Sequence, residues 1–156
     1  EEFQAMADGP IKDNASKIDD VLNTCKYQTI IHGDAKVANF CFSEDGTKVA
    51  ALDFQYAGGG CGMKDIAYFL GSCLNESQCE IWEEELLDSY FISLKSAVNS
   101  KGLDIDFFEL ENEWRLLFPI AWADFSRFLL GWMPKHSKLN SYSDEIINRA
   151  LTLIEM

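Results

Sequence analysis

Apolar residues recur every three to four positions through the second half of the chain, which is the spacing of one face of an α-helix. The pattern predicts a helix over residues 77–99, a longer one that Asp106 opens and Pro119 should kink, and a last one capped by Ser143. The apolar positions that carry it are Ile81, Trp82, Leu86, Leu87, Tyr90, Phe91, Leu94, Val98, Leu110, Trp114, Leu117, Phe118, Ala121, Phe125, Phe128, Leu129, Trp132, Ile146, Ile147, Ala150, Leu151 and Ile154. The second half is therefore predicted to be helical.

The first half is predicted to hold two shorter helices. One covers residues 15–25, with Asn14 available as its N-cap, and the other covers residues 63–74. Between them lie four glycines within residues 58–62, which predict a loop without regular structure. This loop lacks the spacing of a phosphate-binding glycine loop, so it is interpreted as a connection.

Three short β-rich segments interrupt these helices. Residues 27–31 are expected to form one strand, and residues 40–42 and 49–54 are expected to pair as a hairpin across the turn at residues 44–46. A chain of 156 residues with 47% hydrophobic content can bury one sizeable core. The predicted fold class is α+β, mainly α, with one small hairpin.

The run His-Gly-Asp-Ala-Lys-Val-Ala-Asn at residues 32–39, followed by Asp53, carries the candidate chemistry. A His, an Asp two positions later and an Asn five positions after that Asp form the kinase catalytic-loop pattern. Phosphoryl transfer needs a carboxylate to take the acceptor's proton and oxygen ligands for magnesium on the nucleotide phosphates. Asp34 is the candidate base, and Asn39 and Asp53 are the candidate metal ligands. The hairpin should bring Asn39 and Asp53 together, because a tight turn brings the outer ends of two strands side by side.

These residues resemble the aminoglycoside phosphotransferase and choline kinase superfamily, small-molecule kinases with a protein-kinase-like fold. Residues 52–57 (Leu-Asp-Phe-Gln-Tyr-Ala) and 62–70 (Gly-Met-Lys-Asp-Ile-Ala-Tyr-Phe-Leu) are most similar to the ecdysteroid-kinase-like branch, and the resemblance covers residues 29–73. It implies ATP-dependent transfer of a γ-phosphoryl group to a hydroxyl of a small molecule resembling choline, an aminoglycoside or an ecdysteroid. ATP and Mg²⁺ would be the cofactors.

The resemblance also implies roles for three further residues. Lys36 would contact the transferred phosphoryl group, although a solvated lysine is the commoner fate of such a residue. His32 would fix the loop by hydrogen bonding rather than shuttle a proton. Asp65 would support the catalytic loop through backbone hydrogen bonds, and a plain helix-start carboxylate is the alternative.

The acceptor is expected to bind against the helix that follows Asp106. Aromatic faces and a carboxylate suit a cationic ligand, and the residues that could supply them are Trp114, Trp122, Asp124, Phe125 and Trp132. Such a stripe is more often part of a core. The net charge of −13 argues against nucleic acid as a partner and suits a cationic small molecule, or it serves only to keep the surface soluble.

A kinase of this kind also needs a glycine-rich loop and a strand lysine to hold ATP. The residues before His32 contain only the isolated Gly9 and no G-x-G-x-x-G motif. We therefore expect residues 1–156 to be a single domain, the C-terminal lobe of a kinase whose N-terminal lobe is absent. This lobe alone should be inactive.

The remaining composition places the protein in the cytoplasm. Five cysteines, odd in number and without a Cys-x-x-Cys pair, predict reduced thiols rather than disulfides or a zinc site. Residues 116–133 are apolar but are interrupted by Asp124, Ser126 and Arg127, so they are expected to form a buried helix and no membrane span.

Two other classes of protein stay open. A pseudokinase or binding module could use the same fold, and the upstream sequence would distinguish it. A protein kinase is disfavoured by Gly33, by Gln55 and by the absence of an Ala-Pro-Glu element after Asp53.

Overall fold

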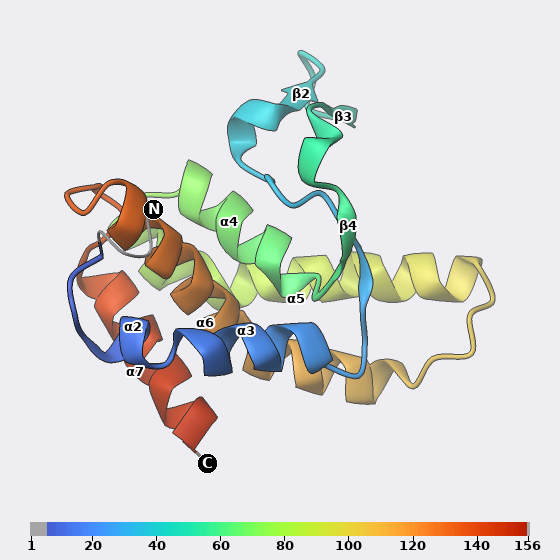
Figure 1. Cartoon of the computed structure of the whole chain (residues 1–156). Coiled ribbons are helices and arrows are strands. Elements are labelled where there is room, and N and C mark those ends of the chain that lie inside the picture. The colour runs from blue at the N-terminus through green and yellow to red at the C-terminus, as the bar shows by residue number, and fades with distance from the viewer. Residues whose placement is uncertain (1–5, 156) are drawn as a thin grey trace.

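Long helices form the frame of the molecule (Figure 1). The computed structural model describes residues 6–155, in which α5 spans Glu76–Ser100, α6 spans Phe107–Trp132 and α7 spans Ser141–Glu155. Helix α6 is central, since it packs against α3, α4 and α7 and buries about half of its residues. The mainly helical α+β class expected from the sequence is confirmed.

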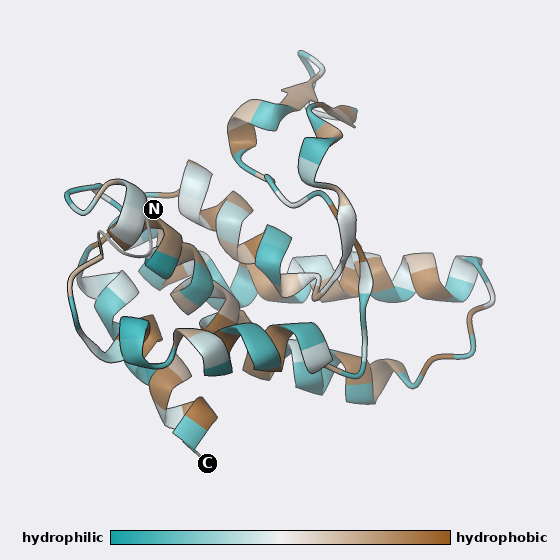
Figure 2. Cartoon of the chain, in the orientation of Figure 1, coloured by the Kyte–Doolittle hydropathy of each residue, from teal (hydrophilic) through white to brown (hydrophobic). Residues whose placement is uncertain are grey.

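The other elements are short. They are α2 (Pro10–Asp13), α3 (Ala15–Thr24), β1 (Thr29–Ile31), η1 (Val37–Asn39), β2 (Phe40–Phe42), β3 (Val49–Ala51), η2 (Phe54–Tyr56), β4 (Gly58–Gly60) and α4 (Met63–Cys73). Apolar and polar residues are interspersed along the helices (Figure 2), so each helix can place an apolar face against the core. Within the described residues no helix is both long and apolar enough to cross a membrane.

The predicted hairpin is present. Strands β2 and β3 pair antiparallel, with Phe40 opposite Ala51 and Phe42 opposite Val49. A further backbone bond from Leu52 N to Asn39 O, 2.8 Å long, extends the pairing beyond the two strands. The hairpin projects from the helical body (Figure 1) and holds the two ends of the candidate site together.

The glycine segment corrects the sequence prediction. Residues Gly58–Gly60 form strand β4, which pairs antiparallel with β1, rather than an irregular loop. The partner strand lies far away in sequence, and local propensity does not reveal such a pairing. A Cβ on Gly60 would come within 2.9 Å of Ile31 Cδ1, the flexible end of a side chain that could move aside.

Of the predicted helix caps, Asp106 is confirmed, since its Oδ1 accepts the Glu109 amide (3.1 Å), whereas Asn14 occupies the N-cap position of α3 without a side-chain bond and Ser143 lies inside α7. The Asn14 side chain makes no capping bond to α3 and instead donates from Nδ2 to Pro10 O (3.0 Å), because the short helix α2 precedes it. Helix α7 begins at Ser141, and Asn140 Oδ1 accepts the Ser143 amide (3.0 Å). The Ser143 hydroxyl is used in the core, where it accepts from Trp122 Nε1 at 3.1 Å.

Candidate active site

The predicted catalytic loop follows β1 and is held from two sides. The Asp65 carboxylate on α4 accepts the His32 amide (2.6 Å) and the Gly33 amide (3.0 Å). His32 Nε2 lies 2.7 Å from Leu52 O, and its ring centroid lies 4.9 Å from that of Phe54. Contacts of this kind are what the resemblance implied for His32 and Asp65. They tie the loop to α4 and to the segment that carries Asp53.

Gly33 adopts a backbone conformation that side chains resist. Its φ is +81°, and a Cβ there would lie 2.4 Å from Tyr56 O. Only glycine accepts both the positive φ and this close approach at low cost. The chain can therefore pass next to η2 at this point and turn Asp34 toward the interior.

Asp34 is buried and surrounded by donors. Its Oδ2 accepts from Lys36 Nζ (2.6 Å) and from Asn39 Nδ2 (2.9 Å), and the Tyr68 hydroxyl also donates to it. Burial acts to raise the pKa of Asp34, but the hydrogen bonds from Lys36, Asn39 and Tyr68 outweigh it and lower the pKa below its usual value. The carboxylate is thus ionised at neutral pH, the state that a general base requires.

Asn39 and Asp53 have oxygens available for a cation. Asn39 uses its Nδ2 for Asp34, and within residues 6–155 neither Asn39 Oδ1 nor the Asp53 carboxylate takes part in a hydrogen bond or ion pair. Asp53 is exposed and has a left-handed backbone (φ 60°), the one non-glycine residue of the described segment with positive φ. Its charge helps to raise the pKa of Lys36, although hydrogen bonding to Asp34 is the larger cause.

This donor set suits magnesium bound mainly through phosphates. Mg²⁺ commonly takes only one or two protein oxygens and fills its other positions with water and nucleotide phosphate. One carboxylate and one amide oxygen, on residues whose backbones the hairpin pairing brings near each other, match that requirement in number and type. The described residues contain no group of three or more His, Cys, Asp or Glu side chains that could hold a metal ion by themselves.

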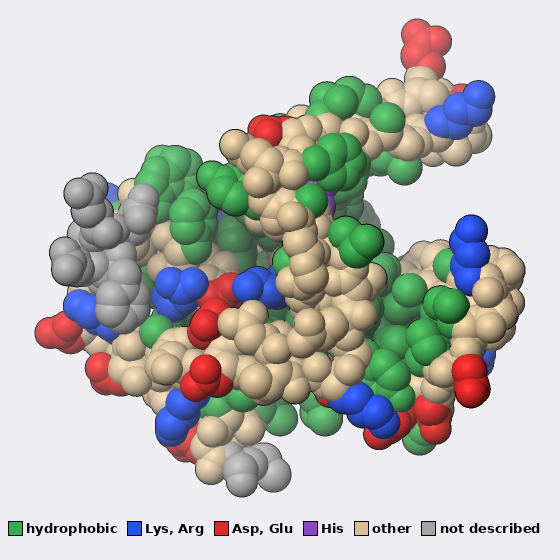
Figure 3. Space-filling model, turned by 45° about the vertical axis from the view of Figure 1, so that its right-hand side comes forward, with side chains coloured by type: hydrophobic (Ala, Val, Ile, Leu, Met, Phe, Trp, Pro, Cys, Tyr) green, Lys and Arg blue, Asp and Glu red, His purple; other side chains and the backbone are tan. Residues whose placement is uncertain are grey.

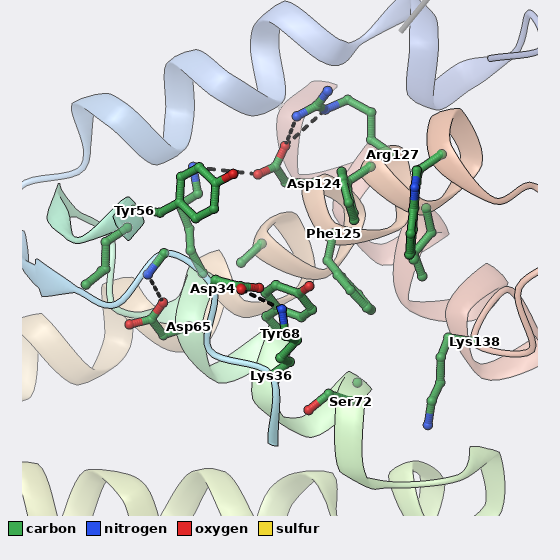
Figure 4. Close-up of a pocket in the computed structure, with 18 of the residues that line it drawn as sticks. Asp34, Lys36, Tyr56, Asp65, Tyr68, Ser72, Asp124, Phe125, Arg127 and Lys138 are labelled. Carbon is green, nitrogen blue, oxygen red and sulfur yellow. Dashed lines mark hydrogen bonds and ion pairs between the residues drawn. The ribbon is translucent and has the colours of Figure 1, made fainter. Parts of the chain in front are cut away.

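A cavity of about 930 Å³ opens beside the loop (Figure 4). Asp34 and Lys36 lie at one part of its wall, next to Tyr68. Helices α4 and α6 supply most of the remainder, and the aromatic side chains in the lining are Tyr56, Tyr68, Phe125, Phe128 and Trp132. Figure 3 shows the hairpin as an arm above the helical body, with open space beneath it.

The structure corrects part of the expected acceptor site. Trp114 and Trp122 belong to the core, with 2% and 1% of their surface exposed, and Trp114 Nε1 donates to Tyr27 O. Phe125 and Trp132 do line the cavity, as does Asp124. The two buried tryptophans lie on the faces of α6 that pack against other elements, which helical spacing alone did not distinguish.

Sequence reasoning missed the contribution of α4 and the basic residues. The missed lining residues include Tyr56, Lys64, Tyr68, Ser72, Arg127 and Lys138. On α4, Lys64, Tyr68 and Ser72 follow one another at four-residue intervals and so share a helix face. This polar stripe, close to the catalytic motif in the sequence, was the signal from which α4 could have been predicted to line the site.

A mainly helical body that carries a kinase-type loop, a supporting carboxylate and an adjoining cavity defines a protein of the kinase-like class. Residues 1–102 match the model of the ecdysteroid kinase-like family, and the chain belongs to this family. The family places it among kinase-like phosphotransferases of small molecules. Comparisons with curated proteins and with solved structures found no match.

Proposed function

We propose that this protein transfers the γ-phosphoryl group of ATP to a hydroxyl of a small molecule bound in the cavity. The observation that carries the proposal is Asp34, a buried, ionised carboxylate in the wall of that cavity, bonded to Lys36 and Asn39. An acceptor hydroxyl beside this carboxylate could pass its proton to Asp34 Oδ as the new bond to phosphorus forms.

The other residues of the site have separate roles in this proposal. Asn39 Oδ1 and the Asp53 carboxylate would hold Mg²⁺, which when bound neutralises charge on the nucleotide phosphates. Lys36, bonded to Asp34, would keep that carboxylate ionised and would contact the transferred group. Asp65 positions the loop through the His32 and Gly33 amides.

We further propose that the chain works as the C-terminal lobe of the enzyme. The strand and hairpin surface around the site exposes large apolar side chains, among them Ile30 (84% exposed), Phe42, Val49, Leu52 and Phe54. Apolar side chains gather along this arm in Figure 3. Exposed apolar groups of this extent mark a surface that another domain or ligand covers, which supports an adjoining lobe and nucleotide at this place.

The five free thiols support the cytoplasm as the compartment of this protein.

A phosphorylation assay of the complete protein tests the proposal. The protein is incubated with Mg·ATP and a panel of amino alcohols, sugars, steroids and aminoglycosides, beside an Asp34→Asn variant that keeps the shape of the side chain. Loss of the base should lower kcat for any accepted substrate by about 10²–10⁴-fold, measured at a temperature at which the variant is folded. Equal turnover by the variant would refute Asp34 as base. A complete protein that binds Mg·ATP but phosphorylates nothing on the panel would favour a binding module.

A further inference from the structure

The charged side chains that line the cavity include one more cation than anion, in contrast to the acidic molecule around them. Four lysines or arginines face three aspartates in the lining, whereas the chain as a whole carries −13. Two of these aspartates are matched: Asp34 pairs with Lys36, and Asp65 accepts two backbone amides. Only Asp34 and Lys36 cancel in charge, so three cations and two carboxylates remain on the rest of the wall.

The excess lies around Asp124. Its Oδ1 accepts from Arg127 Nε (3.0 Å) and Nη2 (2.7 Å), while Lys64 Nζ lies 3.6 Å from its Oδ2 (Figure 4). Two cations thus share one carboxylate. All three side chains are at least two-thirds buried, with exposed fractions of 30% for Lys64 and Arg127 and 15% for Asp124.

The donors of this cluster are not all used. Within the described residues Lys64 Nζ makes no hydrogen bond, only the 3.6 Å ion pair, and Arg127 Nη1 also has no acceptor. A partly desolvated positive charge is stabilised by an anion that accepts such hydrogen bonds, and charge-assisted bonds are the strong ones. The remaining cation, Lys138, donates to Leu74 O instead, and His136 Nδ1 accepts the Lys138 amide.

We propose that Lys64 and Arg127 form a subsite for an anionic group of the acceptor, so that the substrate is a hydroxylated, ring-containing acid. The subsite rests on the proposed function only in taking the cavity as the acceptor site. Aromatic side chains of the same wall, Tyr68 and Phe125, have ring centroids 4.9 Å apart and offer faces for flat or fused rings. The acidity of the whole chain suggested a cationic acceptor, but Asp124 is already neutralised by two cations.

Binding of a matched pair of probes tests the subsite without turnover. Cholate is a rigid, hydroxylated carboxylate, and its primary amide, cholamide, has nearly the same shape without the charge. Isothermal titration calorimetry on the complete protein at low salt, below the micelle concentration and without nucleotide, gives the ratio of the two affinities. We expect cholate to bind about tenfold more tightly, equivalent to about 1.4 kcal/mol.

Three variants test whether the charges of the cluster set the ratio of the two affinities. Lys64→Met and Arg127→Met each leave one cation per carboxylate, so each should bring the ratio to about one while cholamide binding is retained. Asp124→Asn leaves two uncompensated cations and should raise the ratio above that of the wild type. Lys17→Met, at an exposed position of α3 outside the cavity, is the control and should leave the ratio unchanged. Should Arg127→Met fail to fold, Lys64→Met and Asp124→Asn still predict changes of opposite sign.

Each contrary result has a definite meaning. Equal binding of both probes by the wild type, or an unchanged ratio in Lys64→Met, overturns the subsite. Weaker binding of Mg²⁺ and a non-hydrolysable ATP analogue in Lys64→Met, with the probe ratio unchanged, also overturns it and assigns the cations to nucleotide phosphate. The probe ratio is measured on the wild type without nucleotide or turnover, so a failure of the proposed catalysis is distinguishable from a failure of the subsite.

Discussion

At the scale of single residues, the proposed function depends on how Asp34 stays ionised while buried. Burial opposes its negative charge, and donors from Lys36, Asn39 and Tyr68 reverse that effect. The same contact raises the pKa of the Lys36 ammonium, because hydrogen bonding to Asp34 stabilises its charged form. The two residues therefore keep each other charged across the neutral range.

Replacing Lys36 should shift the pH dependence of the reaction. In Lys36→Met, burial of Asp34 is opposed by fewer donors, so its pKa should rise and the acid limb of the kcat/KM profile should move to higher pH. Because the folded pKa of Asp34 is lowered, its ionisation stabilises the fold above the unfolded pKa and loses this effect as pH falls through the folded pKa. The variant should therefore be less stable than the wild type at neutral pH, and the difference should shrink as pH falls toward the folded pKa of Asp34. Lys17→Met is the control, and an acid limb at the same pH in both variants would contradict the coupling.

At the scale of elements, the site is built where short segments meet α4. The catalytic loop follows β1, Asp53 follows β3, and α4 supplies Asp65 and the cavity wall. The sequence predicted the positions of these elements, since turn residues and periodicity are local signals, but the strand expected over residues 49–54 ends at Ala51 and Phe54 begins η2. It did not predict that β1 would pair with the glycine strand β4, because that contact joins segments about thirty residues apart.

Alanine variants of two glycines with similar backbone conformations test why the loop needs glycine at position 33. Gly33 has φ +81° and Gly46 has φ +67°, but a Cβ meets Tyr56 O at 2.4 Å only at Gly33, while at Gly46 it meets nothing within 4 Å. Gly46→Ala should cost about 1 kcal/mol for the left-handed backbone alone. Gly33→Ala should cost clearly more in unfolding free energy and should also lower kcat, since Asp34 must move. Equal losses of stability in urea melts would show that the contact with Tyr56 is unimportant.

At the scale of the whole molecule, a buried polar cluster joins α5 to α7. Glu83 on α5 is 8% exposed and accepts from the Tyr142 hydroxyl (2.9 Å) and from Arg149 Nη1 (2.9 Å), both on α7. Burial and the neighbouring charge of Glu83 raise the pKa of Tyr142 well above its ordinary value. The last helix is thereby fastened to the body that carries the cavity.

Removing the Tyr142 hydroxyl should lower the unfolding free energy at neutral pH and change how that free energy falls at alkaline pH. Because the folded pKa is raised, the neutral phenol stabilises the fold below the unfolded pKa of about 10, and this stabilisation is lost as pH rises above it. Tyr142→Phe should lose about 1.5 kcal/mol at neutral pH, the value of a hydrogen bond to a charged group, yet its stability should fall less steeply above pH 10. Urea melts at several pH values measure both effects. Parallel plots of unfolding free energy against pH for the wild type and Tyr142→Phe would contradict the role of Tyr142. Tyr56→Phe, at an exposed side chain, is the control and should match the wild type at neutral pH.

Periodicity, turn chemistry and motif spacing are properties of neighbouring residues, and they were enough to predict the longer helices, the hairpin and the candidate motif of His32, Asp34, Asn39 and Asp53, but not the short helix α2. Tertiary structure decided which tryptophans of α6 are core, which glycines form a strand, and that Lys64 and Arg127 share Asp124 in the cavity wall. Those outcomes depend on which faces of α4 and α6 meet and on charges brought together across the fold. A local pattern gives the type of an element, and only packing gives its partner.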